Sequence, residues 1–163
     1  MDIECVSEMV GTAADLIEKL IDRCARYAEE IAVLQERTRW VPVEERLPEN
    51  PSPAQIEAAL SKEADAVRAR LPQGCLLIAL CVEGKLCSSE ELAAFLAESA
   101  VRGGSHVVFL IGSSFGLHPS LKALAAKRLS LSPMTFPHHL ARVMLLEQIY
   151  RAYQINSGSR YHK

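Results

Sequence analysis

Two continuous apolar runs dominate the pattern of hydrophobic and polar positions along the chain. They are GCLLIALC (74–81) and SHVVFLIG (105–112), and each is bounded by glycine. Runs of this kind are typical of strands that are buried on both faces of a parallel sheet. Between them, Ser88 is followed three residues later by Glu91, a capping-box pattern that predicts a crossover helix. The pattern therefore predicts an α/β domain with a mainly parallel sheet flanked by helices.

Periodicity and turn residues predict further elements on both sides of these runs. In chain order they are a strand at 2–6, a helix at 12–36, an edge strand at 39–45, a loop at 47–53, a polar helix at 54–70, a loop leading into a short helix within 113–127, and a brief strand or extended segment at 128–135. The sequence has no repeat and no long linker that would divide it. We therefore expect a single domain over residues 1–163.

A last helix is predicted after Pro137, which suits the first turn because its missing N–H costs little there. The segment HHLARVMLLEQIYRA (138–152) is apolar on nearly every side. A helix on a protein surface needs only one apolar stripe, so this helix must be covered from more than one direction. Its few polar positions include Glu147 and Arg151, whose i, i+4 spacing fits an ion pair.

Charge is distributed unevenly along the chain, although the formal net charge is only −2. Residues 117–163 contain seven Lys and Arg against the single Glu147, which gives this segment a charge of +6 and leaves −8 for residues 1–116. Such asymmetry is compatible with an anionic partner at the C-terminal end, either a nucleic acid or a phosphorylated cofactor.

Cysteine usage and hydropathy indicate a soluble, cytoplasmic protein. The five cysteines are an odd number without a C-x-x-C pair, which is typical of reduced thiols. No histidine completes a ligand set with Cys75, Cys81 and Cys87, so we expect no metal. Neither a signal peptide nor an apolar run long enough to span a bilayer is present in the sequence, so we expect no membrane partner.

Three segments that follow predicted strands are candidates for ligand binding, because ligands of open α/β sheets sit beyond the carboxyl ends of the strands. These segments are CVEGK (81–85), GSSFGL (112–117) and SPMTFP (132–137). Gly84, Gly112 and Gly116 either let the backbone approach a ligand closely or serve only to turn the chain. The residues alone leave both interpretations open.

Taken together, these segments resemble the RlmH family, the ribosomal RNA large-subunit pseudouridine N3-methyltransferases of the SPOUT class. The motifs that carry the resemblance are ALCVEGK with SSEELA (within 79–94), VVFLIGSSFGL (107–117), RLSLSPMTFPHHLARVMLLEQIYRA (128–152) and the ending YHK (161–163). The similarity is close over residues 74–163 and holds only in outline before them. It implies a SPOUT-type α/β fold with a C-terminal trefoil knot, which hydrophobic periodicity alone would not suggest because knots are exceptional.

The resemblance further implies a homodimer that binds S-adenosylmethionine as methyl donor and acts on the large-subunit (23S) rRNA of the ribosome. Residues 74–163 would provide the cofactor-binding knot and the helix that packs on the partner subunit. The residues implied to line the methyl-donor pocket are Leu80, Gly112, Ser113, Gly116, Leu131, Ser132, Pro133, Met134, Thr135 and Phe136.

The same resemblance assigns catalytic and RNA-binding candidates. The N3 of a pseudouridine must lose its proton during methylation, and a neutral histidine is a suitable base near neutral pH. The family pattern makes Tyr161 and His162 the catalytic candidates, against the alternative that the tail is a frayed end. Arg142, Arg151 and Lys163 are the RNA-binding candidates, with the ion pair to Glu147 as the alternative for Arg151. Of the two histidines that begin the last helix, at least one is expected to be structural, and His138 matches the family pattern.

Three departures from the family pattern leave a second function open. The loop IGSSFG has Ser113 in place of a second glycine and Phe115 where the family often has an acidic residue. Cys81 stands where an aspartate is common, and no Gly-Lys pair follows the first predicted strand. A positive φ at Ser113 would cost on the order of 1 kcal/mol and crowd the cofactor. The alternative is therefore a weakened or inactive SPOUT-fold protein that binds RNA or the ribosome; a nucleotide-binding protein without a knot fits the last motif poorly.

Overall fold

The computed structural model describes residues 43, 45–102 and 106–159. All of these residues belong to one compact unit that covers residues 40–163. The strand predicted at 2–6 and the helix predicted at 12–36 lie outside the described residues, as do Cys5 and Cys24. Of the predicted strand at 39–45, the two described positions, Val43 and Glu45, have no regular secondary structure.

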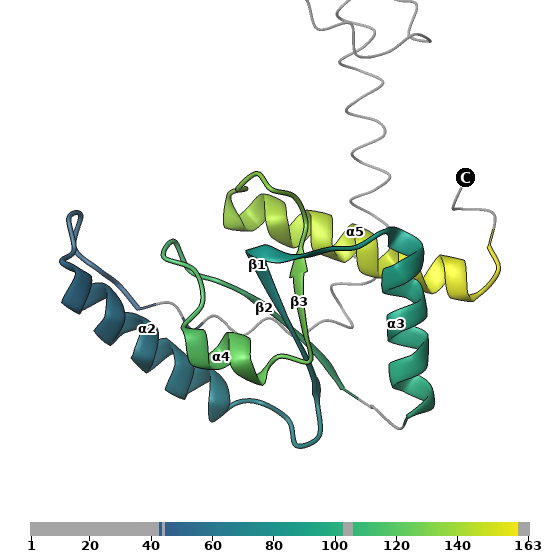
Figure 1. Ribbon diagram of the computed structural model, residues 1–163, viewed down its shortest axis with the longest axis horizontal. Coiled ribbons are helices and arrows are strands. Elements are labelled where there is room, and N and C mark those ends of the chain that lie inside the picture. The colour runs from purple at the N-terminus through teal and green to yellow at the C-terminus, as the bar shows by residue number, and fades with distance from the viewer. Residues whose placement is uncertain (1–42, 44, 103–105, 160–163) are drawn as a thin grey trace, which may run out of the picture. The chain divides into compact units, whose positions relative to one another are not determined.

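The described residues form a three-stranded parallel sheet, as the two apolar runs predict (Figure 1). Its strands are β1 (Leu76–Leu86), β2 (Val107–Ile111) and β3 (Lys127–Ser130), in the order β2-β1-β3. The central strand β1 pairs Leu80 with Ile111 of β2 on one side and with Leu129 of β3 on the other. The ends of β2 and β3 therefore meet β1 at the same level of the sheet.

Among the described residues, four helices connect and cover these strands, and side-chain caps fix the starts of the first three but not of the last. They are α2 (Pro53–Arg68), α3 (Ser89–Val101), α4 (Pro119–Leu124) and α5 (His138–Asn156). The capping box predicted at Ser88 is confirmed, because its hydroxyl accepts from the Glu91 N–H while the Glu91 carboxylate accepts from the Ser88 N–H. Pro137 is the residue just before α5 rather than part of its first turn, because its backbone is extended at ψ 144°.

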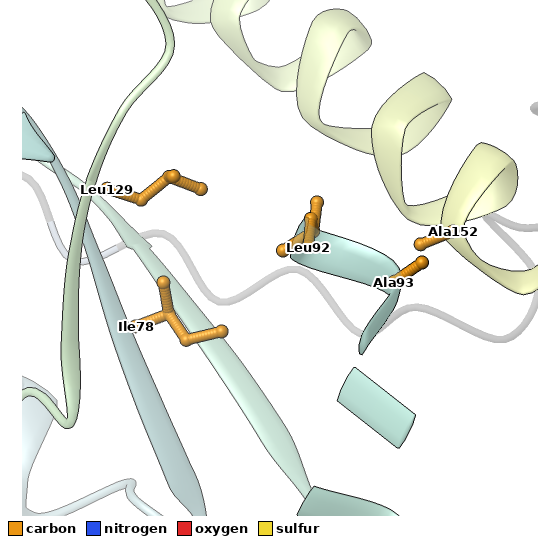
Figure 2. Packing of buried hydrophobic residues seen from close by; sticks show 5 residues of the cluster. All are labelled: Ile78, Leu92, Ala93, Leu129 and Ala152. Atoms are coloured by element: carbon orange, nitrogen blue, oxygen red, sulfur yellow. The ribbon is translucent and has the colours of Figure 1, made fainter. Parts of the chain in front are cut away.

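Two separate apolar clusters pack against opposite faces of the sheet (Figure 1). One cluster joins α2 and α4 to the strands and consists of Ala64, Leu77, Leu110 and Leu121. The other joins α3 and α5 to the strands, and Figure 2 shows its members Ile78, Leu92, Ala93, Leu129 and Ala152. Because neighbours on β1 alternate between these clusters, the strand is buried on both faces, and its continuous apolar run is explained.

One predicted loop is part of a strand. The segment CVEGK (81–85), which was predicted to be a loop after the strand, instead continues β1 as far as Leu86. The extension pairs Lys85 with Leu129 and Leu86 with Ser130 after a register shift. It depends on Gly84, since a Cβ there would lie 2.6 Å from the carbonyl carbon of Leu129. Gly84 therefore serves the close approach of two strands rather than a turn.

Cys75, Cys81 and Cys87 are free thiols. Among the described residues, no helix has the length and apolar character that crossing a membrane would require.

Candidate functional site

The strand register brings the three predicted donor segments to one end of the sheet. Leu80 is buried in the central strand and is flanked by Ile111 and Leu129. Gly112 follows Ile111 directly, and Leu131 lies two residues beyond Leu129. The structure therefore places the start of the 112–117 loop and the start of the 131–136 segment beyond the carboxyl ends of β2 and β3, on either side of Leu80 in the central strand. Ligands of parallel sheets bind beyond such strand ends.

The loop after β2 is closed by a four-residue turn, residues 113–116. The Ser113 N–H donates to the Gly116 carbonyl at 3.1 Å, and the Gly116 N–H donates to the Ser113 carbonyl at 2.8 Å. Gly116 has a φ of 85°, which favours glycine. Gly112 needs to be glycine for another reason, because a Cβ there would lie 2.6 Å from the Gly116 carbonyl carbon. The two glycines together give the loop its tight shape.

Ser113 is compatible with this turn, contrary to the concern raised by the missing glycine. The described part of the chain contains no residue other than glycine at positive φ, so Ser113 carries no such strain. Its hydroxyl lies 3.4 Å from the Gly116 carbonyl oxygen, the same atom that its N–H reaches. The structure thus removes the physical reason for expecting a weakened donor site at this position.

The 131–136 segment is irregular and is held by two serine hydroxyls. Buried Ser130 donates its hydroxyl to the Ser132 carbonyl at 2.9 Å, and the Ser132 hydroxyl accepts from the Met134 N–H at 3.0 Å. Leu131, Ser132 and Phe136 are half-buried, whereas Pro133, Met134 and Thr135 are exposed. The segment therefore offers main-chain polar groups beside apolar side chains, which suits recognition of an adenine-containing ligand.

An ion pair joins the extension of β1 to α4. Glu83 accepts a hydrogen bond from the Lys122 ammonium, and this contact lowers the pKa of the Glu83 carboxyl. Burial, assisted by the negative charge of Glu83, raises the pKa of the Cys81 thiol. Cys81 is therefore a protonated thiol at neutral pH. Sequence reasoning missed Lys122, because its partner lies 39 residues away and no local pattern links them.

The Glu147–Arg151 ion pair predicted from spacing is confirmed. The Arg151 Nε donates to a Glu147 carboxylate oxygen at 2.9 Å, and both side chains are about four-fifths buried. The other carboxylate oxygen accepts from Gln148 at 2.6 Å, and the Gln148 amide oxygen accepts from the Ser89 hydroxyl at 2.7 Å. Arg151 therefore belongs to a network that joins α5 to the start of α3.

The remaining site candidates are placed only in part. Arg142 is half-buried on α5, and His138 is half-buried at the start of that helix. Tyr161, His162 and Lys163 lie outside the described residues, so their predicted roles stay predictions. Among the residues that the structure describes, no group of three His, Cys, Asp or Glu side chains is arranged to hold a metal ion.

A cleft of about 550 Å³ lies beside the 113–116 turn and was not anticipated from the sequence. Its lining residues are Glu45, Arg46, Leu47 and Pro48, Ala59, Leu60 and Glu63 of α2, and Ser113, Ser114 and Phe115 of the turn. The only signal in the sequence was Phe115, an aromatic residue in an otherwise small and polar loop.

Comparison with known proteins finds a matching family model and several related proteins. The family model described as "Predicted SPOUT methyltransferase" matches residues 1–162. A protein of Clostridioides difficile strain 630 is 47% identical over 120 residues, which cover 74% of this chain and 76% of that protein. Proteins of Streptococcus thermophilus strain CNRZ 1066 and Bifidobacterium animalis subsp. lactis strain AD011 are 39% and 38% identical over 153 and 164 residues. These matches cover 93% and 100% of this chain, and 96% and 99% of the two relatives. All three relatives are named ribosomal RNA large subunit methyltransferase H, and this chain therefore belongs to the SPOUT methyltransferases, within the RlmH family.

Proposed function

We propose that this protein is an S-adenosylmethionine-dependent methyltransferase that modifies N3 of a pseudouridine in large-subunit ribosomal RNA. The observation that carries the proposal is the meeting of Leu80, the 113–116 turn and the 131–136 segment at one end of the sheet. The family membership and the printed names of the relatives support a methyltransferase acting on large-subunit rRNA.

Features of the described residues support binding of the methyl donor. Gly112 lies so close to the backbone of Gly116 that no Cβ fits between them. Leu80, Leu131 and Phe136 provide apolar surface, and the irregular backbone of 131–136 provides N–H and C=O groups that can read the edge of a base. The sulfonium of the donor supplies an electrophilic methyl group, so the protein has to position the acceptor and remove its proton.

We assign the removal of the proton from the acceptor N3 to the C-terminal tail. His162 would take the proton from N3 as the methyl group is transferred, and Tyr161 would position the base or the histidine. A neutral imidazole is able to accept a proton near neutral pH without further adjustment. We place this tail over the donor pocket of the partner subunit, so that each active site is built from two chains.

A homodimer is supported by the surface of α5. Leu140, Val143 and Tyr153 on α5 are exposed apolar side chains, and Met134 in the preceding segment is 68% exposed. Apolar side chains gathered in this way mark an interaction surface, and α5 was expected to be covered from more than one side. The trefoil knot and a cytoplasmic location belong to the same proposal, and a crystal structure of the dimer with the donor bound would test the knot, the pocket and the path of the tail together.

The activity is tested by incubating the protein with methyl-labelled S-adenosylmethionine and ribosomes that lack the modification. We expect label in the large-subunit rRNA, and mass spectrometry of the digested RNA should identify N3-methylpseudouridine. Donor binding by calorimetry without any transfer to RNA would contradict the proposal and favour a binding protein on the same scaffold.

The two-chain active site has a sharper test in mixed dimers. Gly112→Ala impairs the proposed donor pocket, whereas His162→Ala impairs the proposed base, so each variant alone should be nearly inactive. In a dimer that contains one chain of each kind, one site combines an intact pocket with an intact tail. Mixing and re-associating the two variants should therefore restore up to about half of the activity per mixed dimer. Failure to restore activity in verified mixed dimers would show that the tail serves its own subunit.

A further inference from the structure

The cleft beside the 113–116 turn has features of a second binding site. Its volume of about 550 Å³ falls within the range of about 300–1,000 Å³ that is typical of sites for small molecules. One wall is Phe115, which is 45% exposed although it is a large apolar side chain. The helix α2 contributes Ala59 and Leu60 to the lining, and both are buried apolar residues.

The polar groups of the cleft indicate which ligand chemistry fits. Glu45 and Glu63 contribute two carboxylates, and Arg46 contributes one guanidinium group, so the cleft carries an excess of negative charge. One oxygen of Glu63 accepts from the Glu45 N–H at 3.0 Å, which orients the carboxylate. A carboxylate has about four acceptor positions, so Glu63 retains the capacity to accept from a ligand. This charge disfavours a phosphate group and favours a neutral ligand that donates hydrogen bonds.

The position of the cleft relates it to the proposed RNA substrate. Ser113 and Gly116 form the turn that faces the proposed donor pocket, and Ser113 also lines the cleft together with Phe115. The two sites therefore share one turn. RNA loops are usually recognised by unstacked bases that lie against aromatic side chains and hydrogen-bond through their edges. The aromatic ring of Phe115 and the oriented carboxylate of Glu63 line the same cleft, and together they offer both kinds of contact.

We propose that this cleft holds an unstacked base of the substrate RNA that neighbours the methylated nucleotide, with Phe115 against its ring and Glu63 accepting from its amino group. The base would be adenine, guanine or cytosine, since these carry an exocyclic amino group. The inference rests on the proposed rRNA methyltransferase function. It makes Phe115 a specificity residue for RNA that has no part in holding the methyl donor.

The test compares RNA and donor interactions of Phe115 variants. For wild type, Phe115→Ala, Phe115→Leu and Phe115→Tyr, we would measure the KM and kcat of transfer to unmodified large subunits, the filter-binding Kd for those subunits, and the calorimetric Kd for S-adenosylmethionine. Removing a stacked aromatic residue weakens binding by roughly 5- to 100-fold. We expect Phe115→Ala to raise KM and the filter-binding Kd by such a factor, with donor Kd and kcat changed less than twofold.

Control variants separate stacking from other effects. Phe115→Tyr should behave like the wild type, and Phe115→Leu should resemble Ala because it keeps apolar bulk without an aromatic face. Glu63→Gln should weaken subunit binding as well, and Val101→Ala, at an 88% exposed position on α3, should change nothing. Circular dichroism of each variant confirms that it is folded.

Each possible result decides between explanations. An unchanged KM and filter-binding Kd in Phe115→Ala would overturn the inference while leaving the methyltransferase function standing. A loss of donor affinity with unchanged subunit binding would overturn it too, because the cleft would then belong to the donor site. If the wild-type protein transferred no methyl group, the proposed function would fail, and the filter-binding comparison would still report whether Phe115 contacts RNA.

Discussion

Replacing Gly112 by alanine tests whether a backbone contact shapes the proposed donor site. A Cβ at position 112 would lie 2.6 Å, 2.8 Å and 2.9 Å from the carbonyl carbon, Cα and oxygen of Gly116. These are backbone atoms, so no side-chain rotation relieves the overlap. Ordinary van der Waals contact begins at 3.4 Å, and the 113–116 turn must therefore move by about 0.8 Å.

The loss of stability in Gly112→Ala follows from the contacts that this displacement disturbs. The two hydrogen bonds between Ser113 and Gly116 measure 3.1 Å and 2.8 Å, so a shift of this size takes at least one of them beyond hydrogen-bond range. Overpacking costs about 1–3 kcal/mol, and a lost hydrogen bond costs about 1 kcal/mol. We expect the free energy of unfolding to fall by about 2–4 kcal/mol, which lowers Tm by about 5–15 °C in a protein of this size.

Thermal unfolding and calorimetric titration with S-adenosylmethionine measure the two consequences. Donor affinity should fall more than about tenfold, because a displacement near 1 Å is enough to misplace a binding loop. Ser114→Ala, at an exposed position of the same turn, is the control and should change neither quantity. Gly116→Ala adds strain of about 1–2 kcal/mol at φ 85° but meets no atom within 4 Å, so its effect should be smaller. Wild-type Tm and donor affinity in Gly112→Ala would refute the reasoning.

Three further predictions concern the packing and charges around the site. Glu147→Ala should lower the free energy of unfolding by about 1–2 kcal/mol in urea titrations. Adding Arg151→Ala should lower it little further, because the two side chains act as one pair. Fully additive losses would contradict this pairing. Ser88→Ala removes the hydroxyl half of the capping box, while the backbone N–H of residue 88 still donates to Glu91, and should cost about 1 kcal/mol, whereas Ser88→Asp should restore most of it; equal stability of the Ala variant would contradict the cap. The lowered pKa of Glu83 means that its stabilising effect is present above its ordinary pKa of about 4.5 and is lost as the pH falls through the folded-state pKa. Because Glu83 is exposed, the effect should be small. In Lys122→Met, the urea midpoint of unfolding should depend less on pH between about pH 5 and pH 3 than it does in the wild type. The same pH dependence in both proteins would argue against the contact.

Local signals in the sequence were enough to predict most of the described fold. The apolar runs predicted two strands of a parallel sheet, and β1 and β2 confirm them. The predicted burial on both faces holds for β1, whereas Leu110 is the one buried residue of β2. Ser88 with Glu91 predicted the start of α3 because a capping box needs only residues three apart. The spacing of Glu147 and Arg151 predicted their ion pair in the same way.

Contacts between distant segments could not be predicted from such signals. The end of β1 was predicted wrongly because Gly84, judged by its neighbours in the sequence, indicates a turn. Glycine is required there because a Cβ at position 84 would lie 2.6 Å from the backbone of Leu129. The cleft was missed for the same reason, since Phe115 and Glu63 come from elements far apart in the chain. The donor-pocket residues were assigned through family resemblance, and only their adjacency, not their roles, follows from the strand register.

The close backbone contacts at Gly84 and Gly112 explain how the 113–116 turn tolerates its departures from the family pattern. Gly84 fits against β3, and Gly112 fits against Gly116, so the contacts on either side of Leu80 need positions without a Cβ. The 113–116 turn itself is closed by main-chain hydrogen bonds, which any residue with negative φ at position 113 can make. Serine at 113 and phenylalanine at 115 therefore leave the shape of the turn intact, and the side chains of the turn are available to vary with the substrate that the neighbouring cleft receives.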